Sequence, residues 1–207
     1  MNNKELSKTA LHIMQHATQM FATNGYEGTI MDALAERAVV NKASIYYHFQ
    51  DKANLYEQCL VNLIKRVVDD VIEEIDSVDG AEKKLVTLIS AMAQKQYANP
   101  DMPAILMREL ATGGMRIPVP AQEQMQRMIY KLKEILDEGV TQKIFKSTDV
   151  FTTHLMIIGT ISLFITSRPI RKTIKTDIAV DPELDEAIEN ITNLILNGIT
   201  KEATEKT

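Results

Sequence analysis

Apolar side chains recur every three or four residues along almost the whole chain, a spacing that places them on one face of an α-helix. The longest such stripe comprises Leu55, Leu60, Leu63, Val67, Val71 and Ile75. The alternation typical of a half-buried strand never persists for more than a few residues. Glycine and proline, which interrupt helices, number only 8 and 6 among 207 residues. We therefore expect an all-α fold.

Turn and capping signals divide the chain into nine predicted helices. Asn24-Gly25-Tyr26 is a stop signal, and Thr29 with Asp32 approximates a capping box at the start of a second helix. Asp51 is a plausible N-cap for a long fourth helix. The predicted helices span residues 5–23, 31–38, 41–49, 52–76, 81–98, 101–111, 119–139, 148–167 and 183–200, with a long loop over 168–182.

Composition points to a soluble, cytoplasmic protein. The single cysteine, Cys59, excludes an internal disulfide and is expected to be a buried apolar side chain. The N-terminus lacks the apolar core of a signal peptide, and no apolar run is long enough to span a bilayer, so no membrane partner is expected. The net charge is −5, yet residues 1–52 carry five basic and five acidic side chains and are neutral. A neutral segment is a weak electrostatic footprint for nucleic acid.

The first three predicted helices are short, and a tight connection joins the second to the third. This arrangement is typical of a helix-turn-helix, in which the second helix braces a third that enters the major groove. Small residues at the start of the third helix would allow close approach, and hydroxyl, imidazole and ammonium groups can bind phosphate oxygens. The candidate DNA-binding residues are Thr29, Asn41, Lys42, Ala43, Ser44, Tyr46, Tyr47, His48 and Lys52.

Residues 13–55 resemble the DNA-binding domain of the TetR family of bacterial transcriptional regulators. The resemblance rests on Asn24-Gly25-Tyr26, on Leu34-Ala35-Glu36-Arg37-Ala38, and above all on Tyr46-Tyr47-His48-Phe49 followed by Asp51-Lys52. It implies a helix-turn-helix domain over residues 1–50 and a ligand-binding and dimerisation domain over residues 51–207. It also implies a homodimer that binds a palindromic double-stranded DNA operator, usually as a repressor, until a small-molecule effector releases it.

The chain departs from the family pattern in the turn before the third helix. Val39 stands where glycine is common, Asn41 replaces serine or threonine, and Ala43 replaces a frequent glycine. A β-branched residue tolerates a left-handed backbone poorly, at a cost of roughly 1–2 kcal/mol. We therefore expect Val39 to keep a negative φ.

Methionines are concentrated in the C-terminal part, where seven of the 11 lie between Met92 and Met156. Each could simply fill the core, but together with nearby aromatic residues they suit an adaptable apolar pocket. The candidate ligand-binding residues are Met92, Tyr97, Met107, Met125, Met128, Tyr130, Met156 and Phe164. The chemistry expected of the effector is therefore apolar, and no cofactor or metal is expected.

The last two predicted helices carry apolar stripes. The resemblance implies that they pair with their twins in a four-helix dimer interface, although a subunit core would produce the same pattern. The candidate interface residues are Leu155, Ile158, Ile161, Ser162, Ile165, Leu184, Ile188, Ile191 and Ile195.

An enzyme is not indicated, because the chain contains no recognisable Ser-His-Asp, Cys-His, paired-carboxylate or glycine-rich phosphate motif. The competing class is a helical small-molecule-binding or interaction protein that keeps the helix-turn-helix but has lost operator binding. The neutral charge of residues 1–52 keeps that alternative open.

Overall fold

The computed structural model describes residues 6–201 and confirms the all-α class. Its described part contains ten helices rather than the nine expected, because a one-turn helix, α9, lies within the predicted loop. The helices are α1 Lys8–Gly28, α2 Met31–Arg37, α3 Lys42–Phe49, α4 Lys52–Asp76, α5 Ala81–Ala98, α6 Asp101–Ala111, α7 Val119–Thr141, α8 Val150–Thr166, α9 Arg168–Arg171 and α10 Leu184–Ile199. No helix among these residues is both long and apolar enough to cross a membrane.

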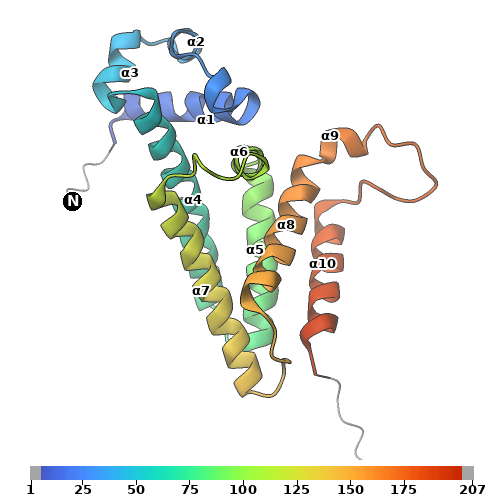
Figure 1. Cartoon of the computed structure of the whole chain (residues 1–207). Coiled ribbons are helices and arrows are strands. Elements are labelled where there is room, and N and C mark those ends of the chain that lie inside the picture. Colours follow the sequence, from blue (N-terminus) through green and yellow to red (C-terminus); the bar gives the residue numbers. More distant parts are fainter. Residues whose placement is uncertain (1–5, 202–207) are drawn as a thin grey trace, which may run out of the picture.

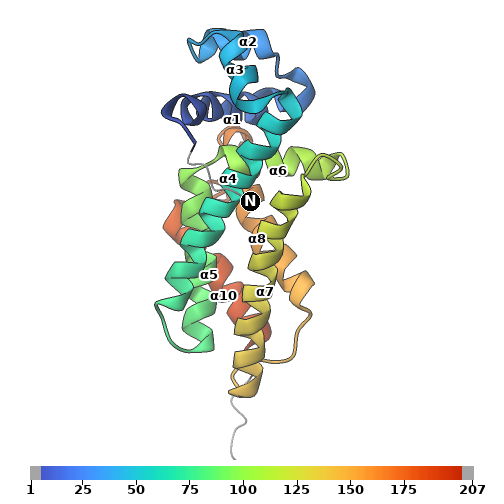
Figure 2. The same ribbon diagram turned by 90° about the vertical axis from the view of Figure 1, so that its left-hand side faces the viewer.

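The helices form a small N-terminal group on the end of a longer body (Figures 1 and 2). Helix α1 lies across the upper part of α4, with α2 and α3 beyond it, and α6 contacts α1 from below. In the body, α4 packs against α5 and α7, and α8 and α10 pack against α5. The chain therefore presents α2 and α3 at one end, far from the C-terminal helices.

Helix α4 joins the two parts and follows its predicted pattern. Asp51 is its N-cap and accepts a hydrogen bond at Oδ1 from the Asn54 backbone N–H, at 2.8 Å. Its apolar stripe is buried against the neighbouring helices and includes Leu55, Leu60, Val67, Val71 and Ile75. Burial of a stripe this long fixes the rotation of α4, and hence the side on which α1 and α3 attach.

The junction between α1 and α2 differs from the prediction. Helix α1 continues to Gly28, but it bends at Gly25, whose φ of 73° is non-helical, so the stop signal marks a kink instead of an end. Thr29 is not the N-cap of α2, and the predicted capping box is wrong. The cap position belongs to Ile30, and the buried Thr29 hydroxyl donates to the Gly25 carbonyl at 2.8 Å.

The predicted negative φ of Val39 is wrong: its φ is 52°, in the left-handed region. Two backbone hydrogen bonds close the end of α2 around it, from Val39 N–H to the Glu36 carbonyl and from Val40 N–H to the Ala35 carbonyl, at 3.1 and 3.0 Å. This is the Schellman arrangement, with Val39 at the C′ position that usually holds glycine. The two bonds satisfy carbonyls at the helix end, and this gain offsets the strain.

Candidate nucleic-acid interface and ligand cavity

Helix α3 has one anchored face and one free face. Ile45 and Phe49 are fully buried in the core that α3 shares with α1 and α4, so they fix its orientation. On the opposite side Tyr47 is 83% exposed and Tyr46 is also exposed, whereas His48 is half-buried with its ring edge-on to Tyr47. A helix held in this way presents a rigid aromatic surface outward.

The N-terminus of α3 is ordered by its own contacts. Asn41 caps the helix, since its Oδ1 accepts from the Ala43 backbone N–H at 2.9 Å. The Lys42 ammonium pairs with the Asp32 carboxylate at 2.7 Å, and the hydrogen bond to Asp32 raises the pKa of Lys42. Ala43 is exposed and Ser44 is half-buried. Asn41 and Lys42 are thus already engaged within the subunit.

Lys52 and Thr29 lie beside α3 rather than on its free face. The Lys52 ammonium sits 4.5 Å from the centre of the Tyr26 ring and donates to the Glu27 carbonyl at 3.3 Å. Thr29 is buried, so its hydroxyl is not presented at the surface. Of the nine predicted DNA-binding residues, Asn41, Lys42, Ala43, Tyr46 and Tyr47 are exposed, and Asn41 and Lys42 already make contacts within the subunit.

Contacts from α6 reach the N-terminal helices. The buried Tyr56 hydroxyl on α4 donates to the buried Glu109 carboxylate on α6 at 2.7 Å, and burial together with this bond raises the pKa of Tyr56. Arg108 donates to the Thr23 carbonyl at 3.0 Å, and its side chain runs under the kink at Gly25. A Cβ added at Gly25 would lie 3.0 Å from the Arg108 Cδ, and the φ of 73° is strained for any residue with a side chain, so both features favour glycine here.

A cavity of about 50 Å³ lies between α4, α5, α6, α7 and α8. We call it the methionine cavity after Met92, Met102, Met125 and Met128, which line it. Three of these, Met92, Met125 and Met128, are among the predicted ligand-binding residues. The other predicted residues, Tyr97, Met107, Tyr130, Met156 and Phe164, do not line it. Apolar periodicity cannot tell which face of a helix meets a cavity.

The methionine cavity also contains polar groups that the sequence reasoning missed. Gln96 and Ser162 are both buried, and the Ser162 hydroxyl donates to the Gln96 Oε1 at 2.9 Å. His154, about two turns before Ser162 on α8, also lines the cavity; it is half-buried, and burial lowers its pKa. A signal was present in the sequence, because Gln96 interrupts the apolar stripe of α5 one turn after Met92.

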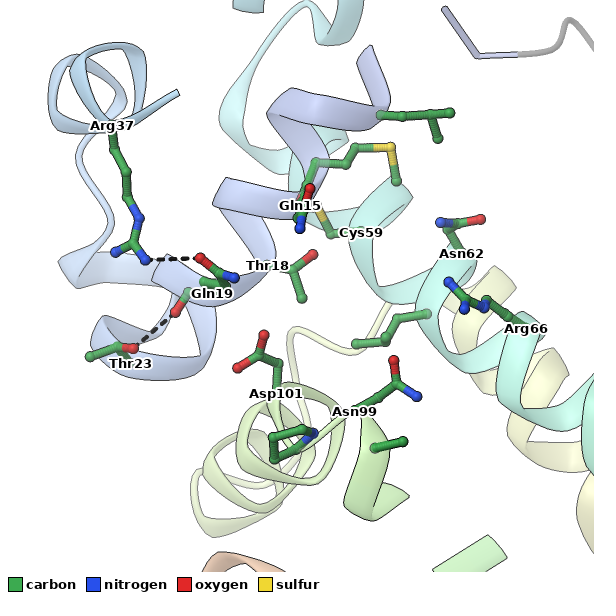
Figure 3. A pocket seen from close by; sticks show the side chains of 15 residues that line it. Gln15, Thr18, Gln19, Thr23, Arg37, Cys59, Asn62, Arg66, Asn99 and Asp101 are labelled. Carbon is green, nitrogen blue, oxygen red and sulfur yellow. Dashed lines mark hydrogen bonds between the residues drawn. The ribbon is translucent and has the colours of Figure 1, made fainter. Parts of the chain in front are cut away.

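A second hollow, of about 930 Å³, opens where α1, α4 and the α5–α6 connection meet (Figure 3). Its walls are mostly polar: Arg37 donates to the Gln19 Oε1 at 2.9 Å, and burial raises the pKa of Asp101. Cys59 lies at its base as a buried side chain, as expected, and burial raises the pKa of its thiol to about 12. These side chains come from separate elements, so no sequence motif marks the hollow.

The predicted dimer stripe divides between the subunit core and the surface. Ile161, Ser162, Ile188 and Ile195 are buried within the subunit, so a partner cannot reach them without rearrangement. Ile158, Ile165, Leu184 and Ile191 are partly buried against the core, and Leu155 is exposed. The exposed large apolar side chains of α8 and α10 are Phe151, Leu155, Met156, Leu163 and Leu194.

Helices α1 to α3, with α3 anchored yet facing outward, and the helical body that carries them define a helix-turn-helix protein. The model "Bacterial regulatory proteins, tetR family" matches residues 13–59, and "Tetracyclin repressor-like, C-terminal domain" matches residues 82–196. The second match alone covers more than half of the chain. The chain belongs to the TetR family, which consists of transcription regulators and not of enzymes.

Known proteins resemble this chain either over part of its sequence or in its overall fold. IcaR of Staphylococcus epidermidis, a negative transcriptional regulator of a biofilm operon, is 30% identical over 80 residues, 37% of this chain and 43% of that protein. The chain thus spans less than half the length of the curated relatives it matches. The fatty acid degradation regulator FadR from Bacillus halodurans matches with a TM-score of 0.74 and 21% identity, over 93% of this chain and 97% of that one. FadR from Bacillus subtilis, in complex with stearoyl-CoA, matches with a TM-score of 0.73 and 22% identity, over 91% and 98%. Both structures bear on the fold alone.

Proposed function

We propose that this protein is a ligand-responsive repressor, which binds a palindromic operator as a homodimer and is released by a small apolar effector. The observation that carries the proposal is α3, locked to its core by Ile45 and Phe49 while Tyr46 and Tyr47 face outward. A rigid helix that presents polar-tipped side chains on one side is suited to the major groove. The name of IcaR as a negative regulator supports repression over activation.

Within this proposal, the residues of α3 make two kinds of contact with DNA. Ala43 and Ser44 are small enough for the backbone to approach base edges, whereas Tyr46, Tyr47 and His48 bind phosphate oxygens and set the register. Two subunits related by a two-fold axis would place two α3 helices in successive major grooves, about 34–36 Å apart.

The charges near α3 predict that electrostatic attraction contributes only modestly to the affinity for DNA. Lys42 is paired with Asp32, and Lys52 rests against Tyr26, so neither is a free phosphate ligand. Each phosphate neutralised by a basic side chain contributes roughly 0.9 to the slope of log affinity against log salt. We therefore expect a shallow salt dependence per subunit and a large share of binding from neutral hydrogen bonds.

The effector would occupy the methionine cavity. Its lining is mainly apolar, and α6 contributes Met102 and Leu106 to it while Arg108 of the same helix touches α1. A ligand that displaces α6 would therefore act on the kinked end of α1. Long-chain acyl thioesters belong in a first screen, since the FadR relative was crystallised with stearoyl-CoA.

The second candidate is a helical binding protein that keeps the helix-turn-helix but no longer binds an operator. The neutral charge of residues 1–52 and the Lys42–Asp32 pair favour it. Retardation of DNA fragments from around the gene in a native gel separates the two candidates. Wild-type protein should retard at least one fragment at about 50 mM salt, and failure with all fragments would sink the repressor proposal.

The same assay tests the role of α3 through Tyr47→Ala. Loss of one phosphate hydrogen bond, of about 0.5–1.5 kcal/mol, should weaken binding several-fold for specific and unrelated DNA alike. Tyr130→Ala is the control, because Tyr130 is an exposed tyrosine on α7, away from α3. Equal affinity of Tyr47→Ala and wild-type protein would contradict the orientation proposed for α3.

A further inference from the structure

Gln96 is a polar side chain placed where the fold otherwise puts apolar ones. It is 1% exposed and lines the methionine cavity one turn after Met92. Its Oε1 accepts from the Ser162 hydroxyl, but within residues 6–201 its Nε2 has no hydrogen-bond partner. A buried amide donor without a partner is destabilising, so its retention inside an apolar cavity requires a reason.

The surroundings of Gln96 restrict what could accept that hydrogen bond. No Lys, Arg, Asp or Glu of the described chain lines the methionine cavity; its other polar members are Ser162 and His154. Burial lowers the pKa of His154, which favours the uncharged imidazole at neutral pH. A charged head group bound here would lie in an apolar environment without a counter-charge, which is strongly unfavourable.

The size of the cavity sets a second condition. At about 50 Å³ it holds no more than one or two water-sized groups, given that a water molecule occupies roughly 30 Å³ in the liquid. Four of the side chains that line it are methionines, which are unbranched and can change rotamer at low cost. Entry of a larger ligand therefore proceeds by rearrangement of Met92, Met102, Met125 and Met128.

We propose that the methionine cavity binds an uncharged, largely apolar ligand with a single carbonyl-type acceptor, which takes the hydrogen bond from Gln96 Nε2. Ketones, esters and thioesters share this chemistry. The inference rests on the proposed function in one respect, that this cavity is the effector site. It goes further by naming the polar group of the ligand and the side chain that selects it.

Three probes of similar size isolate the acceptor and the charge: acetophenone, ethylbenzene and benzoate. Protein labelled with ¹³C at the methionine methyl groups reports binding at the cavity directly, through shifts of Met92, Met102, Met125 and Met128. Acetophenone should bind at least about tenfold more tightly than either ethylbenzene or benzoate, because only it has an uncharged acceptor. Equal binding of acetophenone and ethylbenzene, tighter binding of benzoate, or no shift of these methyls by acetophenone or ethylbenzene at their solubility limits would overturn the proposal.

Gln96→Leu tests the residue itself. The variant should lose the preference for acetophenone over ethylbenzene, whereas Gln94→Leu should keep it, because Gln94 is an exposed glutamine on the same helix. If Gln96 serves only to hold a trapped water, Gln96→Leu will change thermal stability and leave the preference intact, which would overturn the proposal. The comparison of probes on wild-type protein stands even if Gln96→Leu fails to fold.

DNA binding is measured separately, so the two proposals can fail independently. If acetophenone shows the predicted preference and yet does not weaken a retarded DNA complex, the ligand assignment stands and the effector role fails. If DNA is bound and acetophenone has no advantage over ethylbenzene, the ligand assignment fails and the regulator proposal stands.

Discussion

Val39 is a residue whose backbone conformation and side chain are mismatched. Its φ of 52° lies where β-branched residues are strained, and its side chain is 88% exposed, so it gains little from burial. The strain is retained because the hydrogen bonds of Val39 and Val40 close the end of α2 immediately before α3. The turn therefore positions α3 at a local cost.

Val39→Gly should stabilise the protein. Glycine removes roughly 1–2 kcal/mol of strain from the left-handed backbone of the folded state. Its greater flexibility in the unfolded chain costs roughly 0.5–1 kcal/mol of stability, which is the smaller of the two effects. We expect the free energy of unfolding, measured in urea, to rise by about 0.5–1 kcal/mol. Val140→Gly is the control and should lower stability, because Val140 lies within helix α7. A decrease for Val39→Gly would show that the turn is not strained.

Residue-level conformation is the part of the fold that the sequence predicted least well. Both turns that flank α3 adopt positive φ without glycine, at Val39 and at Gln50, whose φ is 65°. At Gln50 a hydrogen bond of 2.7 Å from Asp51 N–H to the Phe49 carbonyl closes a γ-turn. Neither residue type favours such a backbone, and in both turns local backbone hydrogen bonds accompany it.

The helix boundaries were predicted closely, because they depend on apolar periodicity and on helix-breaking residues, which are local features of the sequence. Helices α5 and α6 have the predicted bounds, and Asp51 caps α4. Helix α9 was missed because its four residues lie in a segment that starts with Arg168-Pro169 and has no apolar stripe. The face of each helix that meets a cavity or a partner depends on neighbouring helices, so five predicted pocket residues lie elsewhere.

The link between α4 and α6 gives a prediction at the level of elements. Tyr56→Phe removes the 2.7 Å hydrogen bond to the buried Glu109 carboxylate. Leaving a buried acceptor without its donor should reduce the free energy of unfolding by about 1–3 kcal/mol in urea titrations. Tyr97→Phe is the matched control: the Tyr97 hydroxyl also has one side-chain partner, Arg168, but it is exposed, and its loss should cost less than about 0.5 kcal/mol. If both variants lowered the free energy of unfolding equally, the Tyr56–Glu109 hydrogen bond would contribute no more to stability than an exposed one, and the proposed link between α4 and α6 would be wrong.

At the scale of the molecule, the chain separates two surfaces. Helix α3 lies at one end, and the surface of α8 and α10, which carries exposed apolar side chains, lies on the body away from it (Figures 1 and 2). On that surface Leu155, Gly159 and Leu163 follow one another at four-residue spacing on α8, and Leu194 lies on α10. A Cβ at Gly159 would meet nothing within 4 Å, so the small residue leaves room for a neighbouring helix. This surface, rather than the buried Ile161, is where we expect the second subunit.

Leu163→Asp should therefore convert a dimer into a folded monomer. Leu163 is 57% exposed in the subunit, so a carboxylate there is solvated in the monomer but desolvated and unpaired in a dimer, a penalty of several kcal/mol. Sedimentation velocity at micromolar concentration measures the change, and circular dichroism checks that the helices remain.

Leu110→Asp is the control, because Leu110 is 56% exposed but lies on α6. Ile161→Asp cannot serve, since Ile161 is 1% exposed and a charge there would unfold the subunit. A Leu163→Asp protein that still sediments as a dimer would place the interface elsewhere. If it is monomeric, its DNA affinity should fall with it, because only a dimer can engage both half-sites.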